Sequence, residues 1–255
     1  MIRNVVSFSG GMGSWAAAKR VAASDGIDGL VLLFADTLIE DPDTYRFLNE
    51  AALNIGAPLT RIADGRTPWE VMSDERVIAN TRIDVCSRIL KRDLLAKWIT
   101  TNCDPAVVTL HVGIDWTEAH RLEGVRLRNP GWYYCAPMCE PPYLSKAHVF
   151  ALALDEGLRP PSLYASGFPH NNCGGACVKA GQAQWALLLR THPERYRQVE
   201  KWEDGMRERV GDYSILRDRR GGPTKPLPLR AFRERLVTEE GYDVHEWGGC
   251  GCALE

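Results

Sequence analysis

The stretch "SFSGGMGSWAAA", residues 7–18, follows the apolar run "IRNVV" and predicts a loop between a buried strand and a helix. It contains three glycines and three hydroxyl side chains: Gly10, Gly11, Gly13, Ser7, Ser9 and Ser14. Because glycine has no Cβ, the backbone can approach an anion closely, and the helix that follows directs free N–H groups at it. The stretch therefore predicts a phosphate site. The alternative is a tight connection without a ligand.

The composition is typical of a soluble globular protein. The chain has 255 residues, of which 45% are hydrophobic and 25% charged, and its net charge is −2. This balance gives no global basic field that would favour nucleic acid. No apolar run reaches the roughly 18 residues of a membrane span. We expect a cytoplasmic protein with no membrane partner.

Short apolar runs alternate with amphipathic segments in the first half of the chain. The runs "VVSF", "GLVLLFAD", "APLTRI" and "AVVTLHVG" predict strands, and helices are expected near residues 14–24, 43–55 and 87–101. This alternation is typical of a parallel sheet covered by helices. We predict a doubly wound α/β domain with a mostly parallel sheet over residues 1–130. Residues 131–255 are expected to form a helical, cysteine-bearing extension packed on that domain.

The glycine stretch resembles the S-G-G-x-x-S loop of the PP-loop ATP pyrophosphatases. Ser9, Gly10, Gly11 and Ser14 match it, whereas Gly13 stands where that family has an aspartate. The resemblance implies an adenine nucleotide alpha hydrolase-like fold that binds ATP and splits the bond between its α- and β-phosphates. The residues it implies for ATP binding in this stretch are Ser7, Ser9, Gly10, Gly11, Met12, Gly13 and Ser14.

Three later segments are similar to the phosphoadenosine phosphosulfate (PAPS) reductase branch of the same superfamily. They are "FADTLIEDPDTYRF" (34–47), "CSRILKRD" (86–93) and "HVGIDWTEAHRL" (111–122). The resemblance adds these ATP-binding residues: Phe34, Asp36, Thr37, Gly113, Glu118 and Arg121. It also implies catalytic roles for Cys86, Asp36 and Arg121.

Each of these segments also has a purely structural interpretation. Asp43 and Thr44 could cap the helix that follows the first segment. Arg88, Lys91 and Arg92 could form the solvated face of a helix, although cations beside Cys86 would also favour its thiolate. Glu118 and Arg121, three residues apart, could be a surface ion pair.

Eight cysteines are more than packing alone explains in a reducing compartment. The pairs in "HNNCGGACVKAG" and "GGCGC" favour one metal site formed by Cys173, Cys177, Cys250 and Cys252. We favour a [4Fe–4S] cluster over Zn²⁺, because neither spacing is that of a common zinc ribbon. Three further candidates, Cys135, Cys139 and His170, could replace a ligand, and inert structural thiols are the other alternative.

The resemblance implies an enzyme that transfers AMP from ATP to an acceptor oxygen, releases pyrophosphate and then introduces sulfur. Mg²⁺ is expected with the nucleotide. Sulfur-inserting relatives act in DNA phosphorothioation and tRNA thiolation, so the expected partners are a nucleic acid acceptor and a sulfur donor such as a cysteine desulfurase. A homodimer stays open. The alternatives are a PAPS or adenosine phosphosulfate reductase that acts on a sulfonucleotide, and a non-catalytic nucleotide-binding module.

The arginine-rich stretch, residues 206–235, is the sequence feature that favours nucleic acid. Its cations are Arg207, Arg209, Arg217, Arg219, Arg220, Lys225, Arg230, Arg233 and Arg235, with Tyr213 and Phe232 between them. Arginines suit phosphates and aromatic rings suit exposed bases. We expect it to guide a strand toward the cleft and give salt-dependent binding. The alternative is solvated surface.

Overall fold

A computed structural model describes residues 1–220, 222–238 and 241–249. Five parallel strands form one sheet in the order β3-β2-β1-β4-β5. They are β1 (Asn4–Ser7), β2 (Leu30–Asp36), β3 (Leu59–Ala63), β4 (Thr109–His111) and β5 (Tyr133–Cys135). The predicted α/β fold with a doubly wound parallel sheet is confirmed.

The centre of the sheet is buried on both faces. All four residues of β1 and all seven of β2 are buried, and Val5 lies between Val31 and Leu110 in register. Continuous apolar strands form because helices cover both sides of a parallel sheet. The carboxyl ends of β1, β2 and β4 thus meet at one edge, where open α/β sheets bind ligands.

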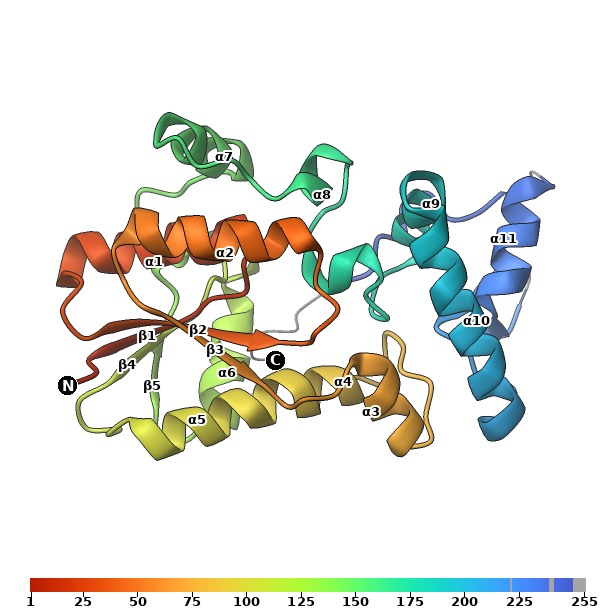
Figure 1. The fold of residues 1–255 in the computed structure, drawn as a ribbon, viewed down its shortest axis with the longest axis horizontal. Helices are drawn as coiled ribbons and strands as arrows, with labels where there is room; N and C mark the ends of the chain where they lie inside the picture. The colour runs from red at the N-terminus through yellow and green to blue at the C-terminus, as the bar shows by residue number, and fades with distance from the viewer. Residues whose placement is uncertain (221, 239–240, 250–255) are drawn as a thin grey trace.

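Two helical layers cover the sheet (Figure 1). One contains α1 (Met12–Asp25) and α2 (Pro42–Ile55), with α7 (Lys146–Asp155) packed against α1. The other contains α5 (Leu94–Asn102) and α6 (His120–Arg128). The N-cap of α2 is Asp41, whose carboxylate accepts from the Asp43 amide. Asp43 and Thr44 therefore lie within the first turn of the helix and do not cap it.

A helical extension follows the sheet and lies at one end of the molecule (Figure 1). It comprises α8 (Ser162–Ala165), α9 (Gln182–Thr191), α10 (Pro193–Val210), a hairpin of β6 (Leu216–Asp218) and β7 (Lys225–Leu227), and α11 (Leu229–Val237). Its core includes Trp185, Tyr196 and Phe232. The sheet continues to Cys135, past the predicted boundary at residue 130.

The extension shares its core with a segment of the first half. This segment contains α3 (Pro68–Asp74), α4 (Val85–Ser87) and the π-helix η1 (Arg88–Asp93), and Val71, Cys86 and Leu90 lie in the same cluster as Trp185. Two short 3₁₀ helices, η2 (Trp116–Glu118) and η3 (Pro137–Cys139), border the carboxyl edge of the sheet, and a third, η4 (Asn172–Gly175), lies between α8 and α9. In the described part of the chain, no helix is both long and apolar enough to cross a membrane.

Candidate active site

The glycine loop joins β1 to α1 as the sequence predicts. Gly10 has φ +75°, a conformation that favours glycine, and a Cβ there would lie 3.0 Å from the Thr44 methyl group. Gly11 is the N-cap of α1, and the first turn of the helix carries no acidic side chain. The free amides at this end therefore face the sheet edge with no carboxylate from the first turn competing for them.

A second loop, after β4, touches the glycine loop backbone to backbone. A Cβ on Gly113 would lie 3.0 Å from the Ser14 backbone nitrogen, and a Cβ on Gly13 would lie 3.3 Å from the Gly113 carbonyl. The resemblance implies that Gly113 binds ATP and opens the turn after the strand. The structure gives it a second task, because any side chain there would displace the start of α1.

Side-chain hydrogen bonds hold the loop from both sides. The Ser9 hydroxyl donates to Ser14 Oγ (3.3 Å), and the Ser14 hydroxyl donates to the Gly11 carbonyl (2.8 Å). The buried Asn171 amide donates to the Gly10 carbonyl (2.9 Å) and to Thr44 Oγ1 (3.1 Å). The sequence analysis missed Asn171. Its only signal is its place beside the Cys173 motif, some 160 residues from the loop.

Two adjoining cavities form a cleft over the loop. The first, which we call the apolar cavity, has a wall of Phe8, Leu33, Phe34, Leu95, Val112 and Val125 and is also lined by Ser7 and Lys91. The second, which we call the polar cavity, is lined by Gly11, Gly13, Asp115, Lys146, His170 and Lys179 and also by the apolar Met12, Met138, Leu144 and Val149. Residues common to both are Ser9, Ser14, Gly113, Glu118, Arg121 and Asn172.

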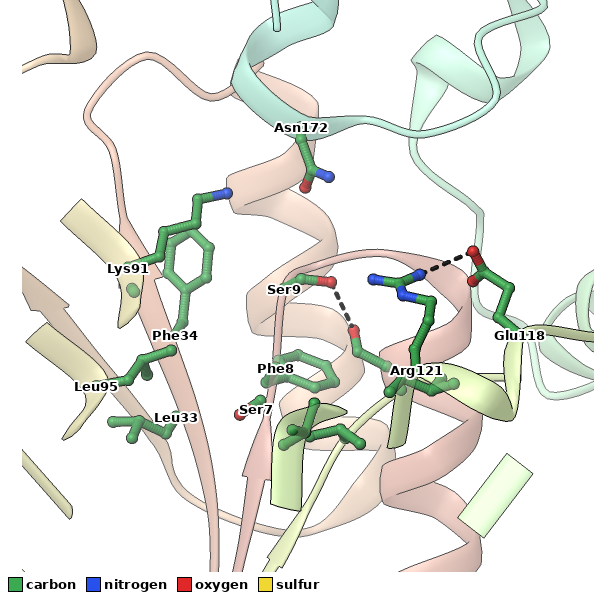
Figure 2. A pocket seen from close by; sticks show the side chains of 16 residues that line it. Ser7, Phe8, Ser9, Leu33, Phe34, Lys91, Leu95, Glu118, Arg121 and Asn172 are labelled. Carbon is green, nitrogen blue, oxygen red and sulfur yellow. Dashed lines mark hydrogen bonds and ion pairs between the residues drawn. The ribbon is translucent and has the colours of Figure 1, made fainter. Parts of the chain in front are cut away.

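Two cations border the cleft. The Arg121 guanidinium lies 2.8 Å from a Glu118 carboxylate oxygen, which is the ion pair given as the alternative, and both residues line the two cavities. Their role in ATP binding stays a prediction. Figure 2 shows the charged ends of Arg121 and Lys91 and the amide of Asn172 around the space beside Ser9. Lys91 is buried, so the alternative that it belongs to a solvated helix face does not hold for it. A partly buried arginine fork and an ammonium suit a polyanionic ligand.

The π-helix η1 separates the three cations of "CSRILKRD". Lys91 points into the cleft and lies 4.0 Å from the buried Glu40 carboxylate. Burial raises the pKa of Glu40 above its ordinary value, and Lys91 acts in the opposite direction. Arg88, by contrast, is half-exposed, and Arg92 pairs with Asp84 (2.6 Å). The solvated-face interpretation thus holds for Arg88 but not for Lys91. π-Helical turns are frequent at functional sites.

Asp36 and Thr37 lie beside the cleft rather than in it. The fully buried Asp36 carboxylate accepts from the Tyr45 hydroxyl (2.8 Å) and the Leu38 amide (2.7 Å) and pairs with Arg61. The Thr37 hydroxyl donates to Glu40 (3.0 Å). Neither residue lines the apolar or the polar cavity. These contacts give Asp36 a positioning role at the end of β2, and its predicted catalytic role stays a prediction.

A third, small cavity brings three cysteines together. This thiol cavity is lined by Cys86, Cys173 and Cys177, with Thr37, Trp69 and Lys91. Cys173 has φ +54°, an unusual conformation for a residue with a side chain, and its amide donates to Glu40 (2.5 Å). Lys91 lines both the thiol cavity and the apolar cavity, so it lies where the two cavities meet.

The predicted metal site is only partly within the described residues. Cys250 and Cys252 lie outside them, while Cys173 and Cys177 share their cavity with Cys86, which the sequence assigned to catalysis. Over residues 1–220, 222–238 and 241–249, no group of three His, Cys, Asp or Glu side chains is arranged to hold a metal ion. The [4Fe–4S] cluster and the Zn²⁺ alternative therefore stay predictions.

The remaining metal candidates are divided between two places. Cys135 ends β5, and Cys139 lies 3.4 Å from the Asp115 carbonyl on the same side of the cleft. Burial raises the pKa of the Cys139 thiol. His170 lines the polar cavity.

The arginine-rich stretch has carboxylate partners within the chain. The ion pairs are Arg207–Asp212, Arg219–Glu246, Arg220–Asp218, Arg230–Asp204, Arg233–Glu200 and Arg235–Asp218. Phe232 is fully buried in the core of the extension. These contacts connect α10, the β6–β7 hairpin and α11. The stretch thus presents less free positive charge than its composition indicates.

Comparisons with known proteins were made with the whole chain. No family model matches it, and no curated protein matches it. One solved structure similar to it is the crystal structure of PAPS reductase from Candida auris in a phosphate complex. The identity is 14%, the match covers 65% of this chain and 78% of that chain, and the TM-score is 0.46.

Proposed function

We propose that the chain binds ATP in the cleft and splits it between the α- and β-phosphates, transferring AMP to an acceptor oxygen and releasing pyrophosphate. One observation carries this proposal: the glycine loop at the start of α1 borders two adjoining cavities, one with a hydrophobic wall beside Lys91 and the other lined by Arg121, Lys146 and Lys179. A nucleoside suits the first cavity and a polyphosphate the second.

In this proposal, different residues contact the adenine and the phosphates of ATP. Phe34 and Leu95 line the wall of the apolar cavity, where adenine would bury its faces. The amides of Met12, Gly13 and Ser14 would bind phosphate oxygens at the helix start. Arg121 would form a bidentate contact to the phosphates as charge develops on the leaving pyrophosphate.

Mg²⁺, if bound, would supply charge neutralisation to the phosphates. The described residues hold no three-ligand metal group. The proposal therefore assigns Mg²⁺ no ligand from these residues, and the ion would have to be held chiefly by ATP and water.

Sulfur chemistry enters the proposal through the thiol cavity. Cys86, Cys173 and Cys177 lie on the other side of Lys91 from the apolar cavity, so a sulfur held there would be adjacent to the nucleotide. We propose that the adenylated acceptor is a nucleic acid, in DNA phosphorothioation or tRNA thiolation, with sulfur supplied by a donor such as a cysteine desulfurase. The terminal sulfur of a persulfide on one of these cysteines would attack the activated atom of the acceptor, and the bond from that atom to the AMP-bearing oxygen would break, so that AMP leaves. A second cysteine thiolate would then attack the S–S bond, which leaves sulfur on the acceptor and a disulfide in the cavity, and a dithiol reductant would restore the thiols.

Product analysis tests the first step. Anaerobically purified protein would be incubated with ATP and Mg²⁺, with and without single-stranded DNA or tRNA, and the products separated by ion-exchange chromatography. AMP and pyrophosphate are expected. The matched control, Arg219→Ala, removes an arginine outside the cleft and should form AMP at the same rate. ADP with orthophosphate would contradict the proposal.

A second candidate function is a reductase for a sulfonucleotide. The observation in its favour is that Lys91 lines both the thiol cavity and the apolar cavity, so a thiol could reach a sulfonyl group on a bound nucleotide. Sulfite release from adenosine phosphosulfate or PAPS with a dithiol reductant would support it. AMP and pyrophosphate formation from ATP without sulfite release favours the first proposal.

A further inference from the structure

Two aromatic rings lie exposed beside the polar cavity. Trp116 is 44% exposed and Tyr143 57% exposed, and their ring centroids are 5.7 Å apart at an interplanar angle of 45°. The two residues belong to segments that are far apart in the sequence. Large aromatic side chains left in solvent as a pair are typical of contact sites rather than of packing. We call this pair the aromatic lip.

The aromatic lip is fixed by the surrounding backbone. The Trp116 indole N–H donates to the Leu144 carbonyl (3.1 Å), which ties the first ring to the segment that carries the second. Arg20 on α1 donates to the carbonyls of Pro137 (2.7 Å) and Glu140 (2.8 Å) and to that of Pro142. The rings are therefore held in place before any ligand binds, which lowers the entropy cost of binding.

The aromatic lip lies where the acceptor, and not ATP, would contact it. Trp116 follows Asp115, and Tyr143 precedes Leu144; both of these neighbours line the polar cavity. Neither ring is itself among the residues that line the apolar or the polar cavity. An acceptor that reaches the glycine loop through the polar cavity must pass its mouth, so the part of the acceptor outside the cleft would contact the lip.

The charges beside the lip favour an anionic acceptor. Lys146 lines the polar cavity, donates to the Pro169 carbonyl (2.7 Å) and lies 5.1 Å from the centre of the Tyr164 ring. The nearby carboxylates are engaged: Asp115 accepts from the Thr117 amide (2.7 Å) and Glu118 pairs with Arg121 (2.8 Å). Cations interleaved with exposed rings are the arrangement that binds single-stranded nucleic acid.

We propose that the aromatic lip is a stacking platform for an unpaired base of the nucleic acid acceptor, whose backbone phosphates then lie toward Lys146 and Arg121. This inference rests on the proposed function, because it names the acceptor of that same cleft. It also places nucleic acid recognition at the cleft mouth instead of on the arginine-rich stretch. Stacking accepts any base, so the platform would add affinity without strong sequence preference.

The test measures binding of a fluorescent single-stranded DNA 12-mer and of an RNA hairpin loop at several salt concentrations. Trp116→Ala is expected to raise the Kd about 5- to 150-fold, the range for loss of one stacked base. The slope of log K against log salt should stay unchanged, since no charge is removed. Trp116→Phe should retain most of the affinity. Tyr213→Ala, which removes another exposed ring from the arginine-rich stretch, should have no effect.

The outcomes separate this inference from the proposed function. AMP formation from ATP without acceptor should be unchanged in Trp116→Ala, and so should the melting temperature. A raised KM for ATP would mean that the ring binds the nucleotide, and loss of a dimer in Trp116→Ala would mean that the lip is a self-interface; either result overturns the platform. Absence of nucleic acid binding by the unmodified chain would overturn it too, whereas AMP formation would still support the ATP step.

Discussion

The cleft and the arginine-rich stretch both look like anion sites in the sequence, but they differ in the folded chain. In the cleft, Lys91 and Arg121 point toward a cavity at a helix start. In the stretch, six arginines each pair with a carboxylate, and these pairs join α11 to α10 and to the hairpin. The difference teaches that the density of cations in a sequence predicts binding only when the fold leaves them facing a ligand.

The physical reason lies in how arginines satisfy their donors. An exposed ion pair contributes little to stability, about 0–1 kcal/mol, but it engages the donors that a phosphate would need. Arg233 illustrates this, because its guanidinium forms two bonds to Glu200 (2.8 and 3.0 Å) across α10 and α11. A phosphate would have to displace such a fork. Arg121 also contacts a carboxylate, that of Glu118 (2.8 Å), but it lines both cavities of the cleft, where a ligand can reach it.

The largest effect is expected from Arg121→Ala. Loss of the guanidinium beside the glycine loop should lower kcat/KM for AMP formation about 100- to 1000-fold, as for other donors that act on developing charge. The kcat/KM of Arg121→Lys should lie between those of the unmodified chain and of Arg121→Ala, because lysine keeps the positive charge but cannot form a bidentate contact. Steady-state pyrophosphate release measures the effect. If Arg219→Ala loses as much activity, the distinction between the two regions fails.

The second effect concerns stability of the extension. Glu203 is fully buried and accepts from the amides of Ile215 (2.7 Å) and Leu229 (2.5 Å), and burial raises its pKa to about 7. Its ordinary value is 4.5. Between pH 4.5 and about 7, the Glu203 carboxyl is ionised in the unfolded chain but still protonated in the folded protein. Glu203 therefore makes its full contribution to the free energy of unfolding below pH about 4.5. That contribution, about 3 kcal/mol, is lost as pH rises through about 7.

Urea unfolding between pH 4 and 8 checks this prediction. In Glu203→Gln, the part of the pH dependence that comes from this group should disappear, so the difference in unfolding free energy between the two proteins should change with pH. A constant difference would show that the carboxyl does not titrate in this range.

Local patterns predicted the parts of the molecule that depend on near neighbours. The alternation of strands and helices gave the sheet, and the run from Ser7 to Ser14 gave the loop, because both are determined within a few residues. Asn171 could not be found in this way, since its bonds to Gly10 and Thr44 form only when η4 packs on the loop. The meeting of Cys86 with Cys173 and Cys177 likewise depends on packing of the extension on α4.

The ion pairs of the arginine-rich stretch could not be predicted from local patterns either. The partners of Arg219 and Arg233 lie 27 and 33 residues away in the chain, so the sequence showed the cations without the acids that pair with them. The sequence analysis considered Lys91, but a helical pattern in the sequence does not show that a π-helical turn brings this side chain into the cleft.

A smaller effect is expected where the two loops of the cleft touch. In Gly113→Ala, the Cβ would lie 3.0 Å from backbone atoms of Ser14, so the start of α1 must move. We expect about a tenfold loss of ATP affinity with little change in melting temperature, because small displacements at a phosphate site are costly. Isothermal titration calorimetry with a non-hydrolysable ATP analogue measures it. The matched control is Gly205→Ala, where a Cβ would meet nothing within 4 Å; equal affinities in the two variants would contradict the role of the contact.

The smallest effect is expected from the change that the sequence alone would rank as the most severe for nucleic acid binding. Neutralising Arg217, Arg219 and Arg220 together would flatten the salt dependence if the stretch guided a strand. In the structure, Arg219 pairs with Glu246 (2.6 Å) and Arg220 with Asp218 (3.2 Å). We therefore expect less than a twofold change in Kd for single-stranded DNA and a slope of log K against log salt altered by less than one, both measured by fluorescence anisotropy. Lys146→Ala at the cleft mouth should lower the slope by about one, since it removes one phosphate contact. The reverse result, a flattened slope in the triple variant and none in Lys146→Ala, would move the acceptor from the cleft mouth to the arginine-rich stretch and show that exposed arginine pairs open for phosphate more readily than their geometry indicates.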